Sequence, residues 1–189
     1  MNVEEIFVSF IATEQLSLSN NTKLIDSCIK KVEKGSDDNQ CYIKYEESTN
    51  EEYNELFPAI QNIIDTLSNH YEINKLQITN AWINLDNSKS ITGAHNHSES
   101  VLSGVYYVSA GAGSGNLEFM SPVTASTYTF RPGSRKSMNR FNSDSWTVTP
   151  KTGQLIIFPS WLYHYVRLNT DNANRISIAF NANFVDTFN

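Results

Sequence analysis

The chain has 189 residues, of which 40% are hydrophobic and 18% charged, and its formal net charge at pH 7 is −6. These values are typical of one globular domain and exclude an intrinsically disordered chain, which has few apolar residues and a high charge. We therefore expect a single domain over residues 1–189.

The amino-terminal segment lacks the features of a targeting sequence. Residues 1–15 carry acids where a signal peptide has a basic region, and no apolar run reaches the length of a membrane span. Cys28 and Cys41 have no CxxC spacing, so neither a zinc site nor a disulfide framework is indicated. We expect a cytoplasmic protein with no membrane contact.

Two amphipathic helices are predicted in the first third of the chain. Residues 22–34 place Leu24, Cys28 and Val32 at helical spacing. Residues 51–73 carry a second apolar face, in which Pro58 fits only a first turn or a kink. We expect residues 1–75 to form a mainly helical cover.

From residue 76 the apolar period changes from helical spacing to two, which indicates strands. Eight short runs, separated by Gly, Pro, Asn and Ser, are predicted as strands at residues 76–85, 101–110, 116–120, 126–130, 145–149, 153–158, 163–168 and 175–184. Eight such strands favour a double-sheet jelly roll, the cupin-like double-stranded β-helix, or a barrel. Because helices precede the strands, we predict an α+β fold in which amino-terminal helices pack on one sheet of a jelly-roll core at residues 76–189.

The charges are unevenly distributed between the two halves. Residues 1–90 carry 7 Lys and Arg against 15 Asp and Glu, and residues 91–189 carry 7 against 5. The second half contains a local basic cluster formed by Arg131, Arg135, Lys136 and Arg140. It is either a solvated loop or the rim of a pocket for an anionic substrate. Nucleic acid is not an expected partner, since domains that bind it are strongly basic.

Three of the four histidines, His95, His97 and His164, lie near turns of the strand-rich half. Side chains two residues apart on an extended chain point to one face, about 7 Å apart, so His95 and His97 can converge on one metal ion. A jelly roll can bring His164 beside this pair. Oxygen-activating iron takes three protein ligands on one face, commonly two His and a carboxylate. Glu99 continues the same face, so a shifted site of His97 and Glu99, with His95 outside it, stays open.

Arg175 is the candidate anion-binding residue. Arg175 and Ser177 share one face of the last predicted strand, and Ile176 and Ile178 share the other. A buried arginine needs an anion, and its planar fork matches a carboxylate with two parallel bonds. Nearby protein acids are expected to be few. The alternative is that Arg175 is exposed on an edge strand.

Four ordered motifs carry a resemblance to a known family. They are AWINL, HNHSESVLSGVYYVSAGAGSGNLEF, GQLIIFPSWLYHYV and RISIAFN, between residues 81 and 184. Together they resemble the iron(II) and 2-oxoglutarate (2OG) dependent oxygenase superfamily, most closely the small oxygenases of marine phages and bacteria. If the chain is viral, its expected location is the host cytoplasm.

The resemblance implies a role for each motif residue. It implies iron ligation by His95 and His164, with His97 where the wider superfamily has Asp or Glu, so that all three histidines form the catalytic metal site. It implies that Arg175, helped by Ser177, binds the distal carboxylate of 2OG. Asn84 and Tyr107 match positions that line the co-substrate pocket.

The activity implied is oxidative decarboxylation of 2OG to succinate coupled to hydroxylation of a C–H bond, with Fe(II) as the metal and ascorbate as the reductant. The substrate, a small molecule, a peptidyl side chain or a modified base, stays open, as does the oligomeric state. One alternative is a cupin-like three-histidine metalloenzyme that does not use 2OG. Another is a non-catalytic metal-binding domain, such as a phage structural component.

Overall fold

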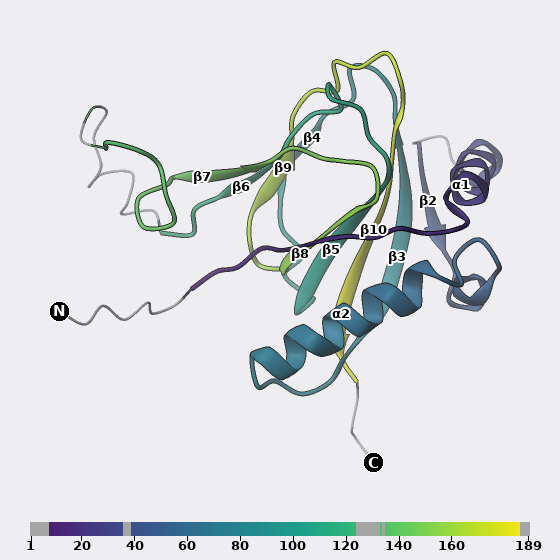
Figure 1. Cartoon of the computed structure of the whole chain (residues 1–189), viewed down its shortest axis with the longest axis horizontal. Helices are drawn as coiled ribbons and strands as arrows, with labels where there is room; N and C mark the ends of the chain where they lie inside the picture. The colour runs from purple at the N-terminus through teal and green to yellow at the C-terminus, as the bar shows by residue number, and fades with distance from the viewer. Residues whose placement is uncertain (1–7, 36–38, 124–132, 134, 186–189) are drawn as a thin grey trace.

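The computed structural model describes residues 8–35, 39–123, 133 and 135–185 (Figure 1). The predicted strand at residues 126–130 and the basic residue Arg131 lie outside this part of the chain. In the described part, no helix combines the length and the apolar composition that crossing a bilayer requires.

Both predicted helices are confirmed. Helix α1 spans Asn21–Gly35 and buries Leu24, Cys28 and Val32. Helix α2 spans Leu56–His70 and begins later than predicted, because Pro58 is tolerated only in a first turn and so limits how far the helix extends toward the amino terminus. A short 3-10 helix, η1, covers Tyr45–Thr49.

The strands form two antiparallel sheets. The six-stranded sheet has the order β1 (Ala12–Gln15), β8 (Gln154–Pro159), β5 (Leu102–Ser109), β10 (Arg175–Phe184), β3 (Leu76–Asp86), β2 (Gln40–Ile43). The four-stranded sheet has the order β4 (Thr92–His95), β9 (His164–Val166), β6 (Leu117–Met120), β7 (Ser145–Val148). Strands β6 and β7 extend away from the rest of the molecule in Figure 1.

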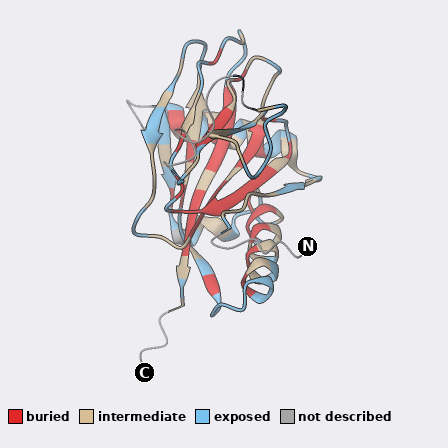
Figure 2. Ribbon diagram, turned by 90° about the vertical axis from the view of Figure 1, so that its left-hand side faces the viewer, coloured by how far each residue is buried: buried red, intermediate tan, exposed pale blue. Residues whose placement is uncertain are grey.

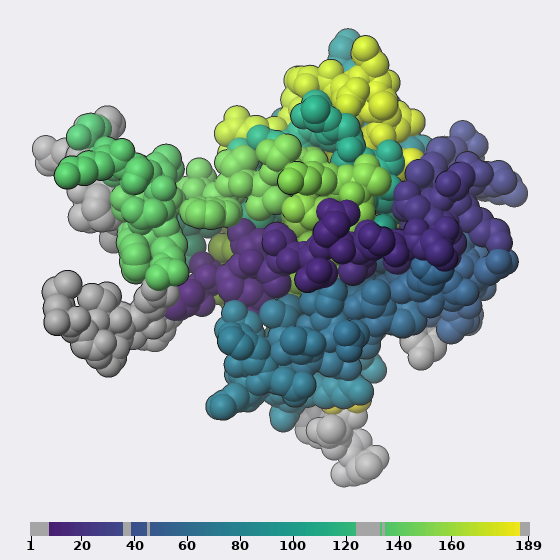
Figure 3. All heavy atoms as spheres, viewed as in Figure 1, coloured from purple at the N-terminus to yellow at the C-terminus, as the bar shows by residue number. Residues whose placement is uncertain are grey.

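Three strands, β1, β2 and β4, were not predicted from the sequence. Each lies at the edge of its sheet, and most of the residues in each are exposed or half-buried. An edge strand without a buried face has no apolar alternation to reveal it. Residues 1–75 therefore contribute β1 and β2 to the larger sheet in addition to their helices. In Figure 3 the amino-terminal residues, in purple, cross one face of the molecule between α2 and the segments drawn in green.

Alternate residues of the central strands pack in two separate hydrophobic cores. On β8, Leu155 and Ile157 pack in the core that α1 and α2 share with the six-stranded sheet, whereas Ile156 and Phe158 face the four-stranded sheet. Figure 2 shows that burial is concentrated in the central strands of the molecule. The helices thus cover one face of a double-stranded β-helix, as predicted, and the other face of the large sheet is left to line a pocket between the sheets.

Candidate active site

Two strands of the smaller sheet bring the three histidines together. His95 ends β4, His164 begins β9, and the two residues are directly opposite each other in the antiparallel pairing. The backbone N–H of His97 donates to the carbonyl of Ser160, in the connection between β8 and β9. The ring centroids of His95 lie 4.4 Å from His164 and 5.0 Å from His97. The histidines predicted to converge therefore form one cluster, whose ring nitrogens lie within 4.8 Å of one another.

Backbone carbonyls fix the orientation of two of these rings. Nδ1 of His95 lies 2.8 Å from the carbonyl oxygen of Gly93, and Nδ1 of His164 lies 2.9 Å from that of Leu162. A carbonyl only accepts, so Nδ1 carries the proton in both rings and Nε2 keeps its lone pair. Metal-bound histidines are commonly held in this way through their second ring nitrogen.

Burial keeps two of the three histidines, His97 and His164, uncharged. Desolvation lowers the pKa of His164 to about 4, against the opposing hydrogen bond to Leu162, and the neighbouring histidines lower it further. Desolvation, reinforced by His95, also lowers the pKa of His97. At neutral pH these two imidazoles are neutral, which is the form that binds a metal.

Aromatic rings surround the cluster. The ring of Phe158 lies 4.7 Å and that of Phe119 6.0 Å from the ring of His164. The ring of Trp82, on β3, lies 5.8 Å from that of His97. These rings exclude water from the sides of the histidines and stiffen their positions.

The cluster opens into a pocket of about 100 Å³, enough for several waters or one small organic acid. Strands β3, β5 and β10 of the larger sheet form its opposite wall. Its lining includes the seven residues to which the resemblance assigns a role: His95, His97, His164, Arg175, Ser177, Asn84 and Tyr107.

Polar groups occupy the middle of the pocket wall. Asn84 and Ser177 are paired in register on β3 and β10, with Nδ2 of Asn84 3.5 Å from Oγ of Ser177. Gln40, on β2, donates to Oδ1 of Asn84 at 2.8 Å. Tyr107 is opposite Ser177 on β5, and burial raises its pKa to about 12, so it stays a neutral phenol that can donate a hydrogen bond.

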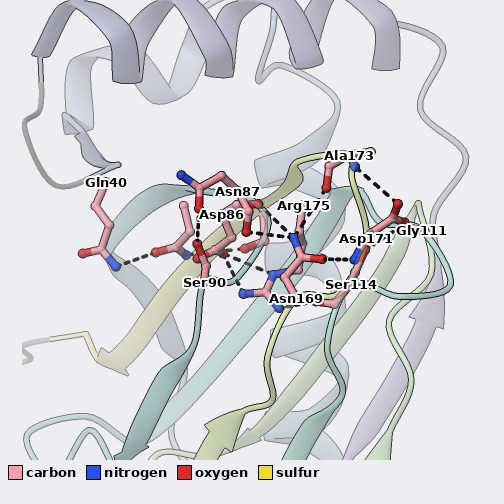
Figure 4. A network of polar contacts seen from close by, with 12 residues as sticks. Gln40, Asp86, Asn87, Ser90, Gly111, Ser114, Asn169, Asp171, Ala173 and Arg175 are labelled. Carbon is pink, nitrogen blue, oxygen red and sulfur yellow. Dashed lines mark hydrogen bonds and ion pairs between the residues drawn. The ribbon is translucent and has the colours of Figure 1, made fainter.

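Arg175 lies at the other end of the pocket and is 2% exposed. Its Nε and Nη2 donate to Oδ2 of Asp86 at 3.2 and 2.8 Å, and its Nη1 donates to the carbonyl of Ser114 at 2.5 Å (Figure 4). Strand β10 runs between β5 and β3, so the alternative of an exposed edge position is wrong. The expectation of few nearby acids also needs correction, because strand pairing places Asp86 directly opposite Arg175.

A glycine brings the Ser114 carbonyl to the guanidinium. Gly115 has φ +81°, and a Cβ there would lie 2.1 Å from the carbonyl oxygen of Arg167. Only glycine satisfies both the left-handed backbone and the close approach. The Gly-rich segment after β5 is therefore part of the arginine site.

The family model described as 2OG-Fe(II) oxygenase matches residues 80–181, just over half of the chain. The chain belongs to the 2OG-Fe(II) oxygenase family. No curated protein matches this oxygenase in sequence.

Solved structures show the same fold at low identity. A Pseudomonas putida prolyl-4-hydroxylase is 14% identical with a TM-score of 0.65, over 93% of this oxygenase and 88% of that chain. A viral collagen prolyl hydroxylase from Paramecium Bursaria Chlorella virus-1 is 13% identical with a TM-score of 0.60. The similarity covers 93% of this oxygenase and 90% of that chain. HygX from Streptomyces hygroscopicus, crystallised with nickel and 2-oxoglutarate, is 11% identical with a TM-score of 0.60. The similarity covers 95% of this oxygenase and 83% of that chain.

The donor set of this oxygenase fits a divalent iron. Two metal–imidazole bonds of about 2.1 Å on the same face of an ion place their nitrogens about 3 Å apart, and one nitrogen from each histidine lies within 4.8 Å of the other two. Movements of each ring by about 1 Å therefore suffice to bring all three onto one ion. Neutral imidazole is a ligand that suits iron.

Several residues singled out from the sequence lie away from the pocket. Glu99 is exposed in the turn after His97 and outside the histidine cluster, so the geometry does not favour the shifted site. His70 ends α2. Arg135 forms an ion pair with Asp144 at 2.5 Å. The histidine pocket is lined by none of the described residues of the basic cluster, which are Arg135, Lys136 and Arg140, so they do not form the rim of that pocket.

Sequence reasoning missed four polar residues of the pocket, Gln40, Asp86, Thr92 and Ser103. Asp86 had a usable signal, because it lies two residues beyond Asn84 and so on the same face of an extended strand. Gln40 had none, since β2 itself was not predicted.

Proposed function

We propose that this oxygenase is an iron(II) and 2OG dependent hydroxylase, in which His95, His97 and His164 hold the iron and Arg175 binds the distal carboxylate of 2OG. The observation that carries the proposal is that the three-histidine cluster and the buried guanidinium line one small pocket. Hydroxylation as the reaction class is supported by the similarity to two prolyl hydroxylases.

The donors of Arg175 support the carboxylate-binding role. Of its five N–H groups, two are directed at Asp86 and one at Ser114. One N–H on Nη1 and one on Nη2 have no partner among the described residues. A carboxylate accepts two parallel bonds from such a fork. The hydroxyls of Ser177 and Tyr107, on the same wall, are suited to assist it.

When bound, iron(II) and 2OG would supply the oxidation, in which 2OG, oxygen and the C–H bond of a substrate yield succinate, carbon dioxide and the hydroxylated substrate. The protein's own residues hold and orient these groups. The backbone contacts of His95 and His164 keep their Nε2 atoms toward the site, Arg175 fixes one end of the co-substrate, and Trp82, with the rings beside His164, excludes water.

Iron titration of two variants from the same loop tests the metal site. We expect the parent protein to bind one iron(II) under anaerobic conditions. His97→Ala should lose most of this binding because it removes a ligand, whereas Glu99→Gln should retain it, since Glu99 lies outside the cluster. Iron loss in Glu99→Gln with retention in His95→Ala would instead establish the shifted ligand set.

A further inference from the structure

The guanidinium of Arg175 already has a counter-charge inside the protein. Oδ2 of Asp86 accepts from Nε and Nη2, and the two side chains are only 2% and 20% exposed. A buried arginine is tolerated only when its charge is balanced. Asp86 supplies that balance, so the arginine site is nearly neutral before any ligand is considered.

We propose that Asp86 is a specificity-determining residue that competes electrostatically with the distal carboxylate of 2OG for Arg175. This rests on the function proposed above, in which that carboxylate binds Arg175. Two carboxylates on one guanidinium repel each other through a partly buried region, where the effective dielectric constant is well below that of water. Asp86 therefore raises the concentration of 2OG that the pocket needs for saturation.

The backbone of Asp86 is fixed, so the competition cannot be relieved by movement of the strand. Asp86 is the last residue of β3 and pairs with Arg175 of β10. Its carbonyl accepts from Nδ2 of Asn169, a fully buried side chain, at 3.1 Å. The same amide group binds the carbonyl of Asn87 at 3.1 Å (Figure 4). Only rotation of the Asp86 side chain can move its charge away from Arg175.

The chain offers a matched pair of substitutions. Asp86→Asn removes the charge and keeps an oxygen that can accept from Arg175. Asp171→Asn makes the same change in the same polar network, where, among the described residues, the Asp171 carboxylate accepts only from the backbone N–H of Ala173 (Figure 4). Asp86→Ser provides a second neutral variant if Asp86→Asn does not fold.

Calorimetry on the anaerobic, iron(II)-loaded protein tests the proposal with two probes. Both 2OG and 2-oxobutyrate carry the 2-oxo acid group, but only 2OG has a distal carboxylate. We expect Asp86→Asn to bind 2OG more tightly than the parent, on the order of ten-fold, and to bind 2-oxobutyrate with unchanged affinity. Asp171→Asn should leave both affinities unchanged.

Two results would overturn the inference and identify which step failed. If the parent binds 2OG but Asp86→Asn binds it equally or more weakly, Asp86 does not compete, and the proposed function stands without it. If the parent binds neither 2-oxo acid, the proposed function fails and the inference fails with it.

Discussion

Single polar side chains in the pocket are held in place by backbone carbonyls. Gly93 and Leu162 accept from Nδ1 of two histidines, and Ser114 accepts from Arg175. Because these acceptors belong to the main chain, the orientation of each functional group depends on the local backbone path. The ligand and anion-binding groups are consequently preorganised, which reduces the cost of ordering them when a ligand binds.

Arginine and lysine should not be interchangeable at position 175. Lysine has a compact ammonium group that cannot bind Asp86, Ser114 and a bidentate carboxylate at once. We expect Arg175→Lys to weaken 2OG binding by about 2 to 5 kcal/mol, much of it from groups left without a charged partner. Calorimetry measures the effect. Arg167→Lys is the control, since Arg167 is exposed and pairs with Glu118; equal affinities in all three proteins would refute the role of Arg175.

The two cysteines should differ in reactivity. Burial raises the pKa of Cys28 to about 12, with a further contribution from Glu52. At pH 8 Cys28 is therefore a thiol, and its side chain is inaccessible, whereas Cys41 is half-buried. Because thiolate is the nucleophile, we expect a disulfide reagent to modify Cys41 in the native protein and both cysteines in denaturant. Rapid native modification of a Cys41→Ser variant would contradict this.

At the level of elements, the sequence predicts the helices and the buried strands well. Strand β10 has the predicted bounds, and α1 extends one residue beyond each predicted end. Both have a strong apolar period on a buried face. The edge strands β1, β2 and β4 have no such face, so only the pairing with a neighbour makes them strands. Tertiary context therefore decides what the local pattern leaves open.

The site was predictable to a similar extent. Period two places His95 and His97 on one face of an extended segment and Arg175 and Ser177 on one face of the last strand. The motif resemblance adds Asn84 and Tyr107. What the sequence does not contain is the register between β3 and β10, which pairs Asp86 with Arg175 across 89 positions. The charge of Arg175 is balanced by Asp86 only because that register places the two residues opposite each other.

A buried asparagine in the connection between β9 and β10 holds the end of β3 in place. Asn169 is fully buried, and its Nδ2 donates to the carbonyls of Asp86 and Asn87 while its Oδ1 accepts from the backbone of Asp171. We expect Asn169→Ala to lower the free energy of unfolding by about 1 to 3 kcal/mol, because buried backbone groups lose their partners. Denaturant unfolding measures this, with the exposed Asn74→Ala as the control. A loss no larger than the control's would show that this network is dispensable.

For the whole molecule, the arrangement of layers explains why the pocket lies where it does. The two helices cover one face of the six-stranded sheet and supply much of the apolar core. The opposite face is then available to meet the four-stranded sheet, whose strands β4 and β9 carry the histidines. The metal end of the pocket comes from the smaller sheet and the anion-binding end from the larger one, so a ligand that joins both ends must enter between the sheets.

Turnover of 2OG without any added substrate tests the central claim most directly. The parent protein, supplied with fresh iron(II), ascorbate, oxygen and 2OG, should form succinate slowly, and the rate should fall to background when iron or oxygen is withheld. His95→Ala, which removes one of the three ligands, should form succinate only at that background rate. Succinate formation by the parent no faster than by His95→Ala would contradict the assignment of this pocket as the site of a 2OG-dependent oxidation.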